Sequence, residues 1–315
     1  MLKGLKSAVV AGTIALAGWA TPSVAADAVI GVSIPAATHG WTGGLNYHTK
    51  RTIDRMKQAF PNVDFVLTTS SSATQQVNDI EDLLARNVNA LVVLPFESDP
   101  LTAPVKAAKA KGVFITAVDR GLGEEGIEDL YVGGDNPQYG RTAAEYFKKK
   151  FPEGGKVVVM RGIPTAIDNI RIEAFEEALK GSKIEVLDKQ YANWNPDKGF
   201  EVMQDYLQRF PQIDGVWAGD DDAALGAIEA IRQSGRQKIA VLGGSGMNKV
   251  IKLVIDGHDL VDADIFYPPT LIVPAIELVT LKFATQAPIT GRYVLDSPLI
   301  TKGNAAEYYF PDAPY

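Results

Sequence analysis

The sequence contains no cysteine and only three histidines, His39, His48 and His258. The absence of cysteine excludes disulfide bonds, thiolate metal sites, cysteine nucleophiles and lipid-modified cysteines. The histidines do not have the spacing of a zinc site, and catalytic designs that need an imidazole have few candidates. We therefore expect no bound metal ion.

Basic residues are also fewer than acidic residues. The chain carries 31 Lys and Arg against 38 Asp and Glu, which gives a net charge of -7. Proteins that bind nucleic acid or anionic membranes present a basic stripe, so neither is an expected partner. The length of 315 residues with 46% hydrophobic content is enough for a sizeable core and favours two domains.

The first 26 residues have the pattern of a secretory signal peptide. Lys3 and Lys6 precede an apolar run of mostly small residues at 8–20, and small residues at 24–26 fit a cleavage site. A membrane anchor is the alternative, but about 13 apolar residues fall short of the roughly 20 that span a bilayer. The expected product is an exported, soluble protein with a net charge of -9, because cleavage removes two lysines and no acid.

Short β-branched runs alternate with segments of helical periodicity along the rest of the chain. Strands are predicted at 28–34, 63–68, 90–94, 113–118, 131–133, 156–160, 184–187, 215–218 and 239–243. Strands separated by crossover helices pair in parallel and have both faces covered, which agrees with their continuous apolar runs. We predict an α/β fold of two doubly wound units with parallel sheets. The apolar segment 269–283 contains Pro274 and is predicted to be a kinked, buried helix that returns to the first unit.

Ligand sites in open parallel sheets lie at the carboxyl ends of the strands. The candidate ligand-binding residues, which follow predicted strands or lie in adjoining loops and helix starts, are His39, Trp41, Asp119, Arg120, Asn169, Arg171, Trp194, Asp220, Ser245 and Tyr267. Vicinal hydroxyls can donate to a carboxylate and accept from a guanidinium, while the C–H face of a sugar packs on an aromatic plane. This mixture of side chains therefore suits a neutral polyhydroxylated molecule.

Several of these residues also have a structural interpretation. Asp119 and Arg120 could form an ion pair, and Trp41 could belong to the core. One of the three acids at 220–222 could cap the helix that follows, because negative charge at a helix N-terminus is favourable. Arg171 could be a solvated helix residue.

Enzyme signatures are incomplete in this chain. The segment 243–247 approaches a nucleophile elbow but has methionine where the last glycine belongs. The acids at 220–222 lack the spacing of a calcium loop, and no dinucleotide fingerprint or phosphate-binding loop is present. We predict no catalytic residue and no cofactor. The aromatic residues at 308–310 and Tyr315 are predicted to serve packing.

The ordered set of motifs resembles the periplasmic sugar-binding proteins of ABC importers, in particular the ribose-binding-like branch of the type I solute-binding fold. The resemblance covers nearly the whole chain after residue 26 and is specific in combination. The segments that carry it are 30–34 with Gly40-Trp41, 113–120, 133–136 followed by Gly140, 171–175, 220–226 and 241–245.

The resemblance implies two Rossmann-like lobes joined by three crossover strands, with a ligand trapped between them. Residues 27–134 with 268–296 would form the N-terminal lobe, and 135–267 with 297–315 the C-terminal lobe. The protein would be a monomer in the periplasm that delivers its ligand to a membrane permease.

The resemblance also assigns roles. Trp41 and Trp194 would sandwich the sugar ring from the two lobes. The hydroxyl-binding residues would be Asp119, Arg120, Arg171 and Asp220. Two positions depart from the family pattern, because Ser245 stands where aspartate is common and Tyr267 where glutamine or asparagine is usual. These departures would weaken or redirect recognition of one side of an aldose.

The expected ligand is a monosaccharide, a sugar alcohol or a similar small polyol. An amino sugar is an alternative, because the carboxylates of Asp119 and 220–222 could hold an ammonium group. Presentation of a signal such as autoinducer-2 to a receptor is a second alternative, and an enzyme is a third. A sugar-responsive repressor shares the two-lobe core, but the export signal and the missing DNA-binding headpiece argue against it.

Overall fold

The computed structural model describes residues 27–236 and 238–315. The predicted signal peptide lies outside these residues. Within the described part of the chain, none of the helices combines the length and the apolar character needed to cross a membrane.

The first sheet has six parallel strands in the order β11-β5-β4-β3-β1-β2. Its strands are β1 (Ala28–Pro35), β2 (Val63–Ser70), β3 (Ala90–Val93), β4 (Phe114–Val118), β5 (Leu130–Gly134) and β11 (Gly291–Leu295). Alternate residues of a strand point to opposite faces, and Val92 packs in one hydrophobic cluster while Leu91 and Val93 pack in another. Both faces of this sheet are therefore buried, which explains the continuous apolar runs.

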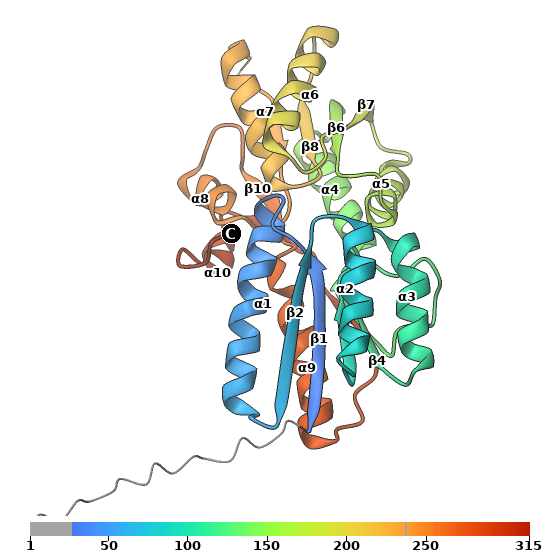
Figure 1. The fold of residues 1–315 in the computed structure, drawn as a ribbon. Coiled ribbons are helices and arrows are strands. Elements are labelled where there is room, and N and C mark those ends of the chain that lie inside the picture. Colours follow the sequence, from blue (N-terminus) through green and yellow to red (C-terminus); the bar gives the residue numbers. More distant parts are fainter. Residues whose placement is uncertain (1–26, 237) are drawn as a thin grey trace, which may run out of the picture.

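Helices cover the two faces of the first sheet (Figure 1). Helices α1 (Gly40–Ala59) and α9 (Ile272–Thr285) pack against each other and against one face, and α2 (Ala73–Ala85) and α3 (Ser98–Ala110) cover the other. In this doubly wound order the chain reverses its direction of winding between β1 and β3, which places a crevice at their carboxyl ends. Helix α1 begins at that crevice.

The second sheet has four parallel strands in the order β7-β6-β8-β9. Its strands are β6 (Gly155–Arg161), β7 (Ile184–Tyr191), β8 (Gly215–Ala218) and β9 (Ala240–Leu242). The helices that follow or flank them are α4 (Asn136–Lys150), α5 (Ala166–Leu179), α6 (Pro196–Arg209), α7 (Asp221–Ser234) and α8 (Asn248–Asp256). Helices α4 and α5 pack as one pair, and α6 and α7 pack as another. Val157 and Val159 of β6 face the first pair, while Val158 and Met160 face the second.

The chain passes between the two sheets three times. The first passage leads from β5 into α4. The second leads from β10 (Ala263–Ile265) through a 3-10 turn, η1 (Pro269–Leu271), into α9, and the third leads from β11 to β12 (Leu299–Thr301). Strands β10 and β12 form an antiparallel pair beside the second sheet, and α10 (Ala305–Tyr308) follows β12.

The predicted α/β class with two doubly wound parallel units is confirmed. The segment predicted as one kinked helix is a 3-10 turn followed by α9, and Pro274 lies in the first turn of α9, where its missing N–H costs little. The sequence interpretation did not include β10, β11 and β12. Strands β10 and β12 have three residues each, and all five residues of β11 are exposed. None of the three therefore shows the long apolar run of a buried strand.

Candidate functional site

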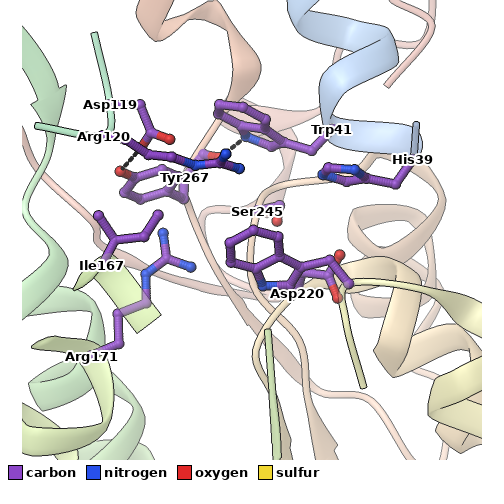
Figure 2. A pocket seen from close by; sticks show the side chains of 10 residues that line it. His39, Trp41, Asp119, Arg120, Ile167, Arg171, Asp220, Ser245 and Tyr267 are labelled. Atoms are coloured by element: carbon purple, nitrogen blue, oxygen red, sulfur yellow. Dashed lines mark hydrogen bonds between the residues drawn. The ribbon is translucent and has the colours of Figure 1, made fainter. Parts of the chain in front are cut away.

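A cavity lies between the carboxyl ends of the two sheets (Figure 2). The empty space at this site is about 340 Å³ when the part that is open to solvent is included. Its lining residues are His39, Trp41, Asp119, Arg120, Ile167, Arg171, Trp194, Asp220, Ser245 and Tyr267. Nine of these ten are among the candidate ligand-binding residues predicted from the sequence.

Asn169 is the predicted site residue that does not line this cavity. It is exposed, and its side-chain oxygen accepts a hydrogen bond from Arg161. Ile167 and Arg171 face the cavity instead, because they are four residues apart and share one face of α5. Asn169 lies midway between them and therefore points to the other side.

Trp41 lies in the first turn of α1 and reaches across to the segment after β10. Its indole N–H donates to the backbone oxygen of Tyr267 at 2.9 Å, and the two rings are 6.4 Å apart between centroids. Only 7% of Trp41 is exposed. The alternative that this residue belongs to the core is thus partly correct, because one part of the ring packs in the first lobe and another lines the cavity.

Trp194 forms the opposite aromatic wall. Its backbone is left-handed, with φ 52°, and its ring lies so close to Gly162 that a Cβ there would be 2.1 Å from the indole. The ring of His39 lies 6.0 Å from it, and the guanidinium of Arg120 lies 5.6 Å above it. A glycine at 162 is needed because only a residue without a side chain lets Trp194 take this position.

Asp119 follows β4 with a left-handed backbone at φ 57°, and only 2% of the residue is exposed. One carboxylate oxygen accepts the hydroxyl of Tyr267 at 2.5 Å, and the backbone oxygen accepts the hydroxyl of Tyr131 at 2.8 Å. Figure 2 shows the Asp119–Tyr267 bond as a dashed line. Tyr267 therefore occupies one oxygen of Asp119 and leaves the other for a further donor.

Two arginines are held with their charged ends toward the cavity. Arg171 donates from Nε to the side-chain oxygen of Asn136 at 2.7 Å, and its guanidinium carbon lies 4.2 and 4.4 Å from the ring centroids of Tyr139 and Tyr267. Arg120 donates to the backbone oxygen of Phe96 at 2.5 Å, whereas its Nε is buried without a partner. Arg171 is therefore a buried residue of the cavity and not a solvated one.

The three acids after β8 have separate roles. Asp220 caps α7, because one oxygen accepts from the N–H of Ala223 at 3.0 Å, but its second oxygen is buried without a partner. Asp222 accepts from the N–H of Gly40 at 3.0 Å and so connects α7 to the first turn of α1. The capping alternative is correct for Asp220, and it leaves one oxygen free at the cavity.

Ser245 is supported by a buried pair of acids. Asp221 accepts from the N–H groups of Gly244 and Met247 at 2.8 and 2.7 Å, and Asp264 accepts from the N–H of Gly246 at 3.2 Å. Both acids are fully buried, and this burial with their mutual repulsion raises the pKa of Asp264 well above its usual value. A protonated Asp264 can donate to Asp221, so the pair holds the loop that carries Ser245.

The sequence profile of the family described as "Periplasmic binding protein domain" matches residues 30–269. This chain belongs to that family. The chain is 30% identical over 241 residues to the ribose import binding protein of Bacillus subtilis, covering 76% of this chain and 77% of the relative. It is 28% identical over 252 residues to the xylitol-binding protein of Mycolicibacterium smegmatis, covering 77% and 70% of the two chains.

Solved structures of solute binding proteins have the same fold as this periplasmic binding protein. An ABC transporter solute binding protein from Bacillus halodurans with bound myo-inositol has a TM-score of 0.82 at 22% identity, covering 93% of this chain and 99% of that one. Another from Mycobacterium smegmatis with bound glycerol has a TM-score of 0.80 at 26% identity, covering 91% and 98%. The predicted family and its two-lobed type I fold are therefore confirmed.

In this periplasmic binding protein His39 is a neutral member of the site. Burial, and then the positive charge of Arg120, lower the pKa of His39 from 6.5 to about 4. The ring is therefore uncharged at neutral pH and can offer one nitrogen as a donor and the other as an acceptor. Among the described residues there is no group of three or more histidine or acidic side chains placed to hold a metal ion.

The lowered pKa of His39 predicts a pH dependence of stability. Between pH 6.5 and about 4 the unfolded chain binds a proton at this ring more readily than the folded protein does. The free energy of unfolding should therefore decrease as the pH falls through this window, and His39→Gln should make the decrease shallower. Urea unfolding of both proteins at pH 7 and pH 4.5 measures the difference. If the free energy of unfolding decreased by the same amount in both proteins between pH 7 and pH 4.5, His39 would not be held neutral by the fold.

Proposed function

We propose that the protein captures a monosaccharide, a sugar alcohol or a similar small polyol between its two lobes and delivers it to the membrane permease of an ABC importer. The proposed ligand-binding residues are the nine predicted residues that line the cavity, and Ile167 adds an apolar contact. Asn169 is not included, because its side chain points away from the cavity.

One observation carries this proposal most directly. The second oxygen of Asp220 and the Nε of Arg120 are buried without hydrogen-bond partners, and both residues line the cavity. An unpaired buried polar group costs about 1–3 kcal/mol, and more when it is charged. A ligand hydroxyl can donate to Asp220 and accept from an arginine, so a polyol supplies both missing hydrogen bonds at once.

The aromatic walls support a sugar-like shape. Trp41 enters from the first lobe and Trp194 from the second, and both are less than 10% exposed. An indole plane packs well against the C–H face of a ring or carbon chain, while the polar edge of the ligand meets the acids and arginines. The relatives support the same ligand class, since they include a ribose import binding protein and a xylitol-binding protein.

The lobes are proposed to have the predicted bounds, with residues 27–134 and 268–296 in the first and 135–267 and 297–315 in the second. The N–H of Gly40 bonds to Asp222, which joins the two lobes next to the cavity. We take this arrangement as the closed form. A ligand that contacts both walls stabilises closure, and the closed surface is what a permease recognises.

The chemistry of the site is binding without turnover. Its acids and arginines are fixed by hydrogen bonds to the backbone and to neighbouring side chains, so they recognise hydroxyls in defined positions. The similar proteins include a ribose import binding protein and a solute binding protein of an ABC transporter. We propose that the chain acts as a monomer in the periplasm, after removal of residues 1–26.

Thermal unfolding of the protein with pentoses, hexoses, polyols and amino sugars tests the proposed function. A ligand present at about 100 times its Kd adds roughly 2.7 kcal/mol of stability, which raises the melting temperature by roughly 5–10 °C. Mass analysis of the recovered compound should show no conversion. Absence of a shift from every hydroxylated compound, or conversion of one of them, would contradict the proposal.

The same screen distinguishes neutral sugars from amino sugars. The free oxygen of Asp220 can accept a hydrogen bond from a hydroxyl or from an ammonium group. Glucose with glucosamine, and galactose with galactosamine, are the matched pairs. A larger shift from the neutral member supports the proposal as stated, and a larger shift from the amine favours the amino-sugar alternative.

A further inference from the structure

The segment 309–315 connects the second lobe to α1 of the first. It begins directly after α10 and is held by Asn248, the first residue of α8. The side-chain nitrogen of Asn248 donates to the backbone oxygens of Phe310 and Ala313 at 2.6 and 3.0 Å, and its oxygen accepts from the N–H of Phe310 at 3.0 Å. The segment is therefore anchored to the second lobe before it reaches the first, and Figure 1 places its end beside α1 and α8.

Tyr315 packs on a surface of α1 that is formed by two glycines. A Cβ on Gly44 would lie 2.8 Å from the Cβ of Tyr315, and a Cβ on Gly40 would lie 3.0 Å from its Cε2. The glycines are four residues apart and thus share one face of the helix. Because they lack side chains, the ring of Tyr315 lies against the helix backbone, and only 6% of the residue is exposed.

The hydroxyl of Tyr315 lies behind the wall of the ligand cavity. It is buried and has no hydrogen-bond partner. Its neighbours include Ser245 and the carboxyl groups at 220–222, and burial together with those negative charges raises its pKa well above the usual value. The charged groups nearby also include Lys249, which faces Asp222. Tyr315 is therefore a neutral aromatic residue that touches both lobes next to the site.

We propose that Tyr315 is a latch that holds α1 against the second lobe and thereby sets the affinity of the ligand site. The proposal rests on the proposed function and concerns a residue that does not line the cavity. The segment 309–315 is anchored to one lobe, whereas the ring contacts the other, so opening of the lobes breaks the contact. A contact made only in the closed form raises the closed fraction, and the apparent Kd varies inversely with that fraction.

The test compares four variants with the wild-type protein. Tyr315→Ala removes the ring, and Asn248→Ala removes the anchor of the segment. Tyr315→Phe keeps the ring without the unpartnered hydroxyl, and Phe310→Ala is the matched control, because that exposed side chain belongs to the same segment while only its backbone bonds to Asn248. The probes are D-ribose, xylitol and myo-inositol, each titrated by calorimetry.

We expect Tyr315→Ala to weaken binding of the best probe roughly tenfold, and Asn248→Ala to weaken it in the same direction. Tyr315→Phe and Phe310→Ala should bind like the wild type. If the melting temperature without probe falls but the Kd stays constant in Tyr315→Ala, the residue has only a structural role and the latch is overturned. If Tyr315→Ala does not fold, Asn248→Ala is judged by the same criterion.

A measurement without ligand separates this proposal from the proposed function. Because the chain has no cysteine, two introduced cysteines are the only sites that a spin label can modify. Lys50→Cys is at an exposed position of α1, and Glu201→Cys is at an exposed position of α6. The distance distribution should shift toward longer values when Tyr315→Ala is added. If no probe binds the wild type, the proposed function fails while this shift still supports the latch. An unchanged distribution overturns it.

Discussion

Replacing Asp119 by asparagine is expected to weaken binding of the cognate polyol about 100-fold or more. The carboxylate is buried, and one of its oxygens is free for the ligand after Tyr267 has taken the other. Hydrogen bonds to a charged group contribute about 1.5–3 kcal/mol each. Two vicinal hydroxyls of a ligand can both donate to this carboxylate oxygen. Isothermal titration calorimetry measures the change in Kd.

Asparagine is the right substitution because the fold can keep it. Residue 119 has a left-handed backbone, which asparagine tolerates better than alanine does, and an amide oxygen can still accept the hydroxyl of Tyr267. Asp129→Asn is the matched control in the same lobe, since Asp129 bonds to the N–H of Ile115 at the amino end of β4 and does not line the cavity. Equal affinity of Asp119→Asn and the wild type would remove Asp119 from the site.

The second large effect is expected from the tryptophans. Trp194→Ala should weaken binding roughly 100-fold, because the ligand loses an aromatic wall and the apolar contact area that it provides. The free energy of unfolding should decrease less than it does when a tryptophan enclosed entirely by protein is removed, since one face of this ring lies at the cavity. Calorimetric titration and urea unfolding of the same preparation measure both quantities.

Trp217→Ala is the matched control for Trp194→Ala. Trp217 is 1% exposed and packs on Phe175, 4.5 Å between ring centroids, and on Tyr139, at 6.2 Å. Its removal should lower the free energy of unfolding by about 3–5 kcal/mol while the folded fraction keeps its affinity. If Trp194→Ala instead reduced stability and left binding intact, Trp194 would be a core residue like Trp217.

The sequence was sufficient to predict most of the strands, because the apolar runs are strong in a parallel sheet that is covered on both faces. It also pointed to the cavity, since the carboxyl ends of parallel strands lie at one edge of each sheet. Asp119 is the first residue after β4 and Asp220 is the second residue after β8, so their position at the sheet edge does not depend on the conformation of a long loop.

What the sequence did not predict depends on contacts between distant segments. Helix α5 begins at Ala166, and its periodicity puts Ile167 at the cavity in place of Asn169. The left-handed backbone of Trp194 has no local sequence signal. Tyr315 was predicted to serve packing, and its packing partner on α1 is more than 200 residues away in the chain.

The central claim is that the facing rims of the two lobes enclose a hydroxylated ligand. A crystal structure of the protein with the sugar or polyol that gives the largest thermal shift tests it most directly. We predict the ligand between the indoles of Trp41 and Trp194, with hydroxyl oxygens within hydrogen-bonding distance of Asp119 and of the free oxygen of Asp220. A ligand bound elsewhere, with this cavity holding only water, would contradict the account.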